Sequence, residues 1–199
     1  MKVIVIGASG TIGQAIAANL ASRHEVIAVG SKSGQYQADI ADIASVRTLF
    51  AQVGKVDAVV VAAGSVHFGP LAQMQPEQFE IGLKSKLMGQ VNVAQVAQDY
   101  LNDGGSITLT SGIVGRETIR YGASASMVNS AIEGYARGAA VELARGLRIN
   151  VVSPTILQES LEAYGPYFLG FEAAPAARVA LAYSRSIDGA QTGQVYTVG

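Results

Sequence analysis

A glycine-rich turn follows the first apolar segment of the chain and precedes an alanine-rich helical run. In such a strand–turn–helix unit the first glycine permits a sharp turn and the second lets backbone approach a phosphate. The third lets the helix lie close to the sheet, and the helix N-terminus offers free N–H groups to an anion. We interpret the turn as dinucleotide-binding rather than merely structural. The residues expected to contact the ligand are Gly7, Ser9, Gly10, Thr11, Ile12 and Gly13.

The composition fits one domain spanning residues 1–199, because 49% of the residues are hydrophobic and only 15% are charged. A net charge of −1 gives no attraction to nucleic acid or to an anionic membrane, so neither is an expected partner. The chain has no cysteine and two histidines, which argues against a metal site. No signal sequence or membrane-spanning run is evident, and we expect a cytoplasmic protein.

Apolar, β-branched segments alternate with helical stretches along the chain. This alternation predicts an α/β fold, a three-layer, doubly wound parallel sheet of the Rossmann type, in a single domain. The expected strands are Val3–Ile6, Val26–Val29, Val56–Ala62, Ser106–Thr110, Arg148–Val152 and Gln194–Val198. The expected helices are Ile12–Ser22, Ile43–Val53, Pro76–Leu101, Ala123–Leu147 and Pro175–Ser184.

One connection departs from this pattern. About six residues separate Val29 from the next candidate strand, Tyr36–Asp39, whereas a parallel crossover usually needs about a dozen or more. Either the usual helix between strands 2 and 3 is short or missing, or the strand at Tyr36 is marginal. We expect a short extended crossover.

Several segments together resemble the short-chain dehydrogenases/reductases over nearly the whole chain. They are the glycine turn, Asp39–Asp42, Val59–Gly64, Ile107–Gly112, Arg148–Pro154 and Thr192–Val195. The resemblance implies a nicotinamide dinucleotide cofactor, a small-molecule substrate, and Ser111 as the catalytic serine. It also implies cofactor contacts at Asp39, Ile40, Ala62, Ala63, Gly64, Pro154 and Ile156.

The residues after the second strand bear on the choice of cofactor. An NAD site usually places an acid there, whereas an NADP site offers positive charge and hydroxyl groups to the 2′-phosphate. This chain has Ser31, Lys32 and Ser33 and no acid. A solvated turn that happens to hold a lysine is the alternative. We favour NADP, with NADPH preferred over NADH.

The family's tyrosine and its lysine four residues later are absent, because no lysine follows Lys86. Alignment on the family's motifs puts Ala125 at the tyrosine position and Asn129 at the lysine position. The same alignment puts Lys86 where the family has an asparagine. The lysine and asparagine thus look exchanged between two helices, and we expect Lys86 to contact Asn129 beside Ser111.

Several side chains could replace the missing proton donor. Tyr121 lies about one helical turn before the vacant position, Lys86 could donate if burial lowers its pKa, and His67 lies in a loop near the pocket. Each also has a plainer role, in packing, at the surface or in a solvated loop. The aromatic segment Leu157–Phe171 could be a substrate lid or a packed loop.

Two functions of different classes follow. One is an NADP-dependent oxidoreductase with a degenerate active site, and the other is a non-catalytic NADP(H)-binding sensor or assembly protein. The two long helices, Pro76–Leu101 and Ala123–Leu147, are rich in small residues. Because small residues permit close helix pairing, we expect a homodimer or homotetramer through these helices.

Overall fold

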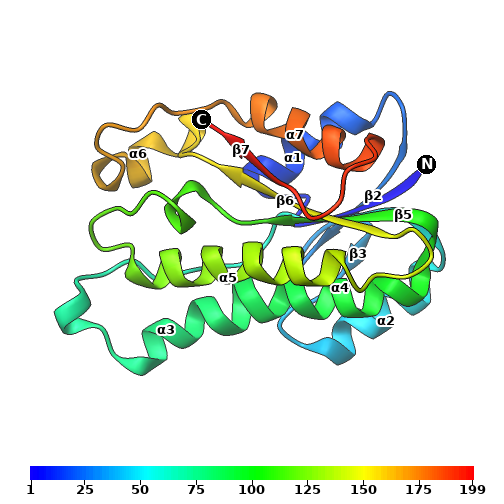
Figure 1. Ribbon diagram of the computed structural model, residues 1–199, viewed down its shortest axis with the longest axis horizontal. Coiled ribbons are helices and arrows are strands. Elements are labelled where there is room, and N and C mark those ends of the chain that lie inside the picture. Colours follow the sequence, from blue (N-terminus) through cyan, green and yellow to red (C-terminus); the bar gives the residue numbers. More distant parts are fainter.

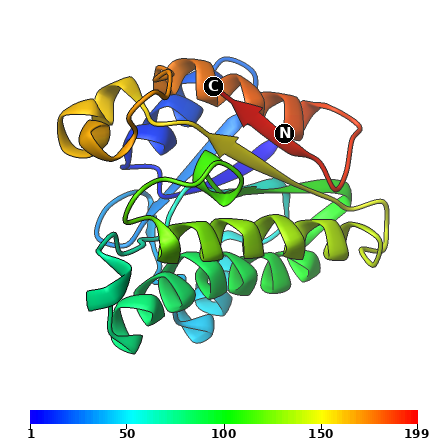
Figure 2. The same ribbon diagram turned by 60° about the vertical axis from the view of Figure 1, so that its left-hand side comes forward.

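The computed structural model describes residues 1–199 as one α/β domain with a central sheet between two layers of helices (Figures 1 and 2). All seven strands are parallel, in the order β3-β2-β1-β4-β5-β6-β7. Their bounds are β1 Lys2–Ile6, β2 Glu25–Gly30, β3 Tyr36–Gln37, β4 Val56–Val61, β5 Leu101–Thr110, β6 Arg148–Pro154 and β7 Val195–Val198. The predicted Rossmann-type fold is confirmed.

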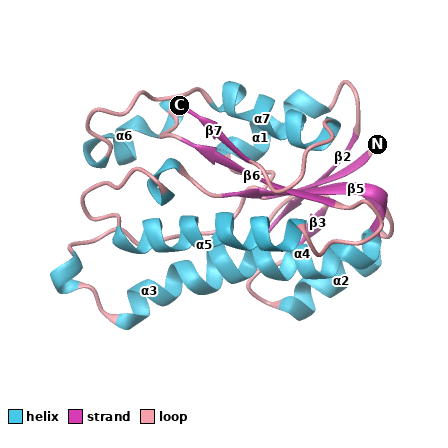
Figure 3. Ribbon diagram, in the orientation of Figure 1, coloured by secondary structure: helices cyan, strands magenta, loops and turns pink.

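Helices cover both faces of the sheet (Figure 3). The bounds of the main helices are α1 Thr11–Leu20, α2 Ile43–Val53, α3 Pro76–Gly82, α4 Gly89–Tyr100, α5 Ala123–Ala140, α6 Leu161–Tyr164 and α7 Ala176–Asp188. Alternate residues of a strand face opposite layers. Ile4 and Val59 therefore pack with the α2, α4 and α5 layer, whereas Val3 and Val60 pack with the α1 and α7 layer.

The connection from β2 to β3 contains no helix, as the spacing predicted. Residues 31–35 join the two strands, with Gly34 at φ +107°. The backbone N–H of Gln35 donates to the carbonyl of Ala28, which closes the turn. Strand β3 is only two residues long, so this edge of the sheet is short.

The predicted helix Pro76–Leu101 is wrong as a single α-helix. It is divided into α3, a π-helical segment at Leu83–Met88, and α4, while Leu101 already belongs to β5. Both ends of the π-helical segment lie close against other elements. A Cβ on Gly82 would lie 2.9 Å from a Val128 methyl group, and one on Gly89 would lie 2.7 Å from Ile40.

The predicted helix Ala123–Leu147 is too long, because α5 ends at Ala140. Tertiary hydrogen bonds hold Arg145 in the left-handed region, at φ +58°. Its guanidinium donates to the carbonyl of Leu101 at 3.0 Å, to Asp103 at 2.8 Å, and to the carbonyl of Gln98. No local sequence pattern encodes these contacts. No helix in the fold is both long and apolar enough to cross a membrane.

Candidate functional site

Gly7 and Gly13 keep the end of β1 free of side chains. Gly7 has φ +86°, and a Cβ there would lie 2.3 Å from the carbonyl oxygen of Ala62. A Cβ on Gly13 would lie 2.0 Å from the carbonyl oxygen of Gly7. Gly10 is the N-cap of α1 and supplies no side-chain cap, so the first N–H groups of this helix stay free. Bare amides of this kind fit a pyrophosphate.

A cavity of about 370 Å³ lies beside this turn, at the carboxyl ends of β1, β2 and β4. It is lined by most of the residues predicted to bind the cofactor: Gly7, Ser9, Gly10, Ser31, Asp39, Ile40, Ala62, Ala63 and Gly64. Sequence reasoning missed Ile6, Gly30, Ala38, Ser65 and Ser85, which complete the lining. Outside the lining are Thr11, Ile12, Gly13, Lys32, Ser33, Pro154 and Ile156. The turn and the ends of these strands thus form one nucleotide-sized recess.

A second cavity, of about 430 Å³, adjoins the first and shares Gly64 and Ser65 with it. Ile156, expected on the nicotinamide side, lines this second cavity, and Pro154 is the last residue of β6. The two cavities together extend from the glycine turn to the loop after β6. This is the course that an extended dinucleotide would follow at the carboxyl edge of a doubly wound sheet.

The expected contact between Lys86 and Asn129 is present. Lys86 Nζ donates to Asn129 Oδ1 at 2.8 Å and to the carbonyl oxygen of Ser111 at 3.0 Å. Asn129 is oriented by its own Nδ2, which donates to the carbonyl of Ala125 at 2.7 Å. Burial lowers the pKa of Lys86 from its ordinary 10.5 to about 8. The hydrogen bonds to Asn129 and to the carbonyl of Ser111 use two of the three N–H groups of the ammonium, which leaves one N–H for a further acceptor.

Lys86 lies in the π-helical segment and packs beside Gly64, the glycine that both cavities share. A Cβ on Gly64 would lie 2.5 Å from the Cα of Lys86. Single π-helical turns inside α-helices are often found at functional sites. Here the segment brings the lysine to the carboxyl ends of β4 and β5.

A buried carboxylate that sequence reasoning missed holds the side chain of Ser111. Ser111 Oγ donates to Glu133 Oε1 at 3.1 Å, and Arg116 Nε donates to Glu133 Oε2 at 2.9 Å. Glu133 is 3% exposed, and Arg137 approaches it to 3.9 Å. An acid four residues after Asn129 falls on the same face of α5, and that spacing was the available signal.

The other two candidate proton donors, Tyr121 and His67, contact residues outside the group formed by Lys86, Asn129 and Ser111. Tyr121 has the unusual φ of +65°, and its ring meets Tyr167 edge to face at 6.3 Å between centroids. The guanidinium of Arg120 lies 5.0 Å from the centre of the Tyr121 ring. His67 Nε2 lies 3.1 Å from Gln78 Nε2. Neither Tyr121 nor His67 hydrogen-bonds to Lys86, Asn129 or Ser111.

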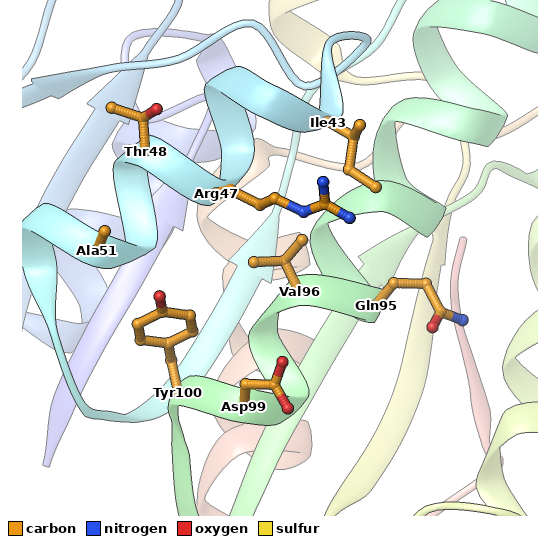
Figure 4. Close-up of a pocket in the computed structure, with 8 residues that line it drawn as sticks. All are labelled: Ile43, Arg47, Thr48, Ala51, Gln95, Val96, Asp99 and Tyr100. Carbon is orange, nitrogen blue, oxygen red and sulfur yellow. The ribbon is translucent and has the colours of Figure 1, made fainter.

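A larger groove, of about 690 Å³, lies elsewhere on the molecule, between α2 and α4. Figure 4 shows Arg47 of α2 reaching toward Val96 of α4, with Asp99 and Tyr100 further along the same helix. Its lining comes only from helices and includes no strand end or glycine turn. Size alone therefore does not identify the nucleotide site in this fold.

The fold and the glycine turn define a dinucleotide-binding α/β protein of the Rossmann type. The chain belongs to the short-chain dehydrogenase/reductase family: a family model described as enoyl-(acyl carrier protein) reductase matches residues 11–188. The chain is 32% identical over 163 residues to tetrahydroxynaphthalene reductase PfmaG of Pestalotiopsis fici. That match covers 78% of this chain and 59% of the relative. A Pyricularia oryzae tetrahydroxynaphthalene reductase is 30% identical, over 67% of this chain and 50% of its own length. The chain thus spans little more than half the length of these relatives.

Solved structures resemble the whole chain. Protein lin1944 from Listeria innocua is 48% identical, with a TM-score of 0.98 and full coverage of both chains. A small-chain dehydrogenase in complex with NADPH is 28% identical, with a TM-score of 0.89, covering 100% of this chain and 96% of its own.

Proposed function

We propose that this protein is an NADP-dependent oxidoreductase that transfers hydride between NADP(H) and the carbonyl or alcohol group of a small molecule. The observation that carries the proposal is the pair of cavities joined at Gly64 and Ser65, one against the glycine turn and one against the loop after β6. Bound nicotinamide supplies the hydride, while the protein supplies position and electrostatics. A similar small-chain dehydrogenase contains NADPH, which supports this choice of cofactor.

The proposed preference for NADPH over NADH rests on the turn after β2. Ser31, Lys32 and Ser33 are all exposed there, so their polar groups are free to meet a 2′-phosphate. Asp39, the nearest acid in the cavity lining, already accepts from the backbone N–H of Ala41 at 2.9 Å. One of its carboxylate oxygens therefore already has a donor within its own turn.

The proposed proton donor is Lys86. Ala125, at the position of the family's tyrosine, is 1% exposed and has no proton to give. Lys86 has a pKa of about 8 and one N–H free of protein acceptors, and a general acid works best when its pKa is near the working pH. Asn129 and the carbonyl of Ser111 hold the ammonium in place.

A non-catalytic NADP(H)-binding sensor or assembly protein is the second candidate. The hydrogen bond from Ser111 Oγ to Glu133 favours it, because a serine committed to a buried carboxylate is less available to hold a substrate oxygen. The absence of the tyrosine points the same way, since general acid catalysis contributes about 10²–10⁴-fold to rate.

We also propose a homodimer or homotetramer that pairs copies of the helical layer formed by α4 and α5. Met127, Ala131, Gly134 and Gly138 share one face of α5, and nothing lies within 4 Å of a Cβ built on either glycine. Such a face lets two helices approach closely. The cytoplasmic location expected from the sequence stays a prediction.

The test is a titration with NADPH and NADH followed by a turnover panel of aldehydes, ketones and quinones. Nucleotide fluorescence reports binding without overlap, because the chain contains no tryptophan. NADPH loss that is greatly reduced in Lys86→Met supports the enzyme and its donor. Tyr121→Phe and Ser111→Ala identify a different donor if they have the larger effect. Tight NADPH binding with no turnover in the panel favours the sensor, and no binding of either nucleotide contradicts both functions.

A further inference from the structure

The second cavity is lined without any lysine, arginine, aspartate or glutamate. Its walls come from the segment after β4 and the segment after β6, and the lining is aromatic, aliphatic or hydroxylated. The main contributors are Val66, Phe68, Ile156, Leu157, Tyr164 and Phe168. At about 430 Å³ it falls within the range of about 300–1,000 Å³ that is usual for small-molecule sites.

The aromatic rings around the cavity support one another. Phe68 lies 6.0 Å from Tyr164 and 5.9 Å from Tyr167 between centroids, and Tyr167 in turn meets Tyr121. Phe168 and Phe171 pair edge to face at 5.5 Å. Aromatic partners favour such offset and tilted arrangements at about 4.5–7 Å. A flat ring entering the cavity therefore meets rings that are already held by their neighbours.

Charges near the cavity disfavour an anionic occupant. The segment from 157 to 172 contains three glutamates, Glu159, Glu162 and Glu172, and no lysine or arginine. The nearby cations are already engaged: Arg116 pairs with Glu133, Arg120 lies over the Tyr121 ring, and the one free N–H of Lys86 is assigned to the carbonyl oxygen of the substrate. A carboxylate or phosphate on the occupant would lose its hydration without gaining a counter-ion.

We propose that this cavity binds a flat, uncharged aromatic carbonyl compound, which is the substrate class of the reductase. The inference rests on the proposed function, because the cavity adjoins the nucleotide recess at Gly64 and Ser65. In the reduction, the carbonyl carbon gains a hydride from the reduced nicotinamide dinucleotide, which becomes NADP⁺. The carbonyl oxygen gains one proton, which Lys86 supplies as the proposed donor, and the product is the corresponding alcohol.

Binding of three matched bicyclic ketones to the full chain tests the proposal, with and without NADP⁺ and independently of turnover. The probes are 1-tetralone, a carboxylated 1-tetralone and the saturated 1-decalone, measured by calorimetry. We expect 1-tetralone to bind about tenfold or more tightly than the carboxylated probe, because no cation meets the carboxylate. We expect it to bind about threefold or more tightly than the saturated ketone, because ring contacts are lost.

Two substitutions in the lining test whether the ketone binds in this cavity. Phe68→Leu keeps apolar volume and should lower 1-tetralone affinity about threefold to tenfold. Ser160→Arg adds a cation to the lining and should raise the affinity for the carboxylated probe, a gain that misfolding cannot imitate. Tyr100→Leu, in the groove between α2 and α4, is the matched control and should change neither affinity.

Absence of saturable 1-tetralone binding, equal affinities for the three ketones, or no effect of both cavity variants would overturn the inference. NADPH titration of the same samples separates this failure from that of the proposed function. Ketone selectivity without any NADPH binding contradicts the reductase but leaves the cavity assignment intact. NADPH binding without ketone selectivity contradicts the cavity assignment but leaves the proposed reductase intact.

Discussion

Lys86 Nζ donates a 2.8 Å hydrogen bond to Asn129 Oδ1, joining the π-helical segment between α3 and α4 to α5 beside the end of β5. The sequence places these residues 43 positions apart. In the alignment that we propose with the family's motifs, the pair reverses the order of the family's asparagine and lysine. On that alignment, the positive charge stays at the site but comes from the other helix.

The pH dependence of stability is expected to report on Lys86. Its pKa is about 8 in the folded protein and about 10.5 in the unfolded chain, so between these values the unfolded state binds more protons. The free energy of unfolding should therefore gain a contribution that rises with pH from about 8 to about 10.5. Urea unfolding of wild type and Lys86→Met across this window measures it. Identical pH slopes for the two proteins would contradict the lowered pKa.

Reduction is expected to decline above about pH 8, because the proposed donor loses its proton there. The pH profile of kcat in the presence of saturating NADPH measures this directly. A profile that is unchanged in Lys86→Met would assign the proton to another group.

Gly13→Ala should abolish NADPH binding and lower stability by about 1–3 kcal/mol, because its Cβ would meet the carbonyl of Gly7 at 2.0 Å. Ala18→Ser, at an exposed position of the same helix, is the control and should bind NADPH normally. Fluorescence titration and thermal unfolding give the two readouts. Normal NADPH affinity in Gly13→Ala would mean that the glycine turn is not the nucleotide site.

Lys32→Glu is expected to weaken NADPH binding about tenfold or more and to change NADH binding far less, because only NADPH carries the 2′-phosphate. Arg178→Glu makes the same change of charge on α7, away from the nucleotide recess, and controls for the effect of net charge on binding. Equal losses for NADPH and NADH would argue against a 2′-phosphate contact at Lys32.

Glu133→Ala should destabilise the fold by about 1–3 kcal/mol, because it leaves the buried hydroxyl of Ser111 without an acceptor. Glu133→Gln retains an acceptor oxygen and should cost less. Denaturant unfolding compares the two with Glu142→Ala, an exposed control just after α5. If Glu133→Ala also raises turnover, the carboxylate restrains Ser111. A stability equal to wild type would show that this bond contributes little.

Gly134→Leu is expected to convert the proposed oligomer to a monomer while leaving NADPH binding intact. A side chain there meets open space within one copy but would block close pairing of α5 with a second copy. Light scattering after size exclusion measures the mass, and Ala177→Leu on the other helical layer is the control. A wild-type monomer would contradict the oligomer at once.

The sequence by itself determined the alternation of strands and helices, the glycine turn and the missing helix between β2 and β3. These features depend on local spacing: apolar runs of strand length, glycines at a turn, and too few residues for a crossover. The contact between Lys86 and Asn129 was also predicted, from the alignment of both residues with the family's motifs, and the structure confirms it.

Only the tertiary structure decided where the long helices end and which side chains of the site contact one another. The π-helical segment around Lys86 and the residues after α5 make contacts with distant segments, such as those of Gly82 with Val128 and of Arg145 with Leu101. The commitment of Ser111 to Glu133 likewise needs two elements packed side by side. Local sequence encodes backbone preference, whereas burial and hydrogen-bond partners arise only when the layers close over one another.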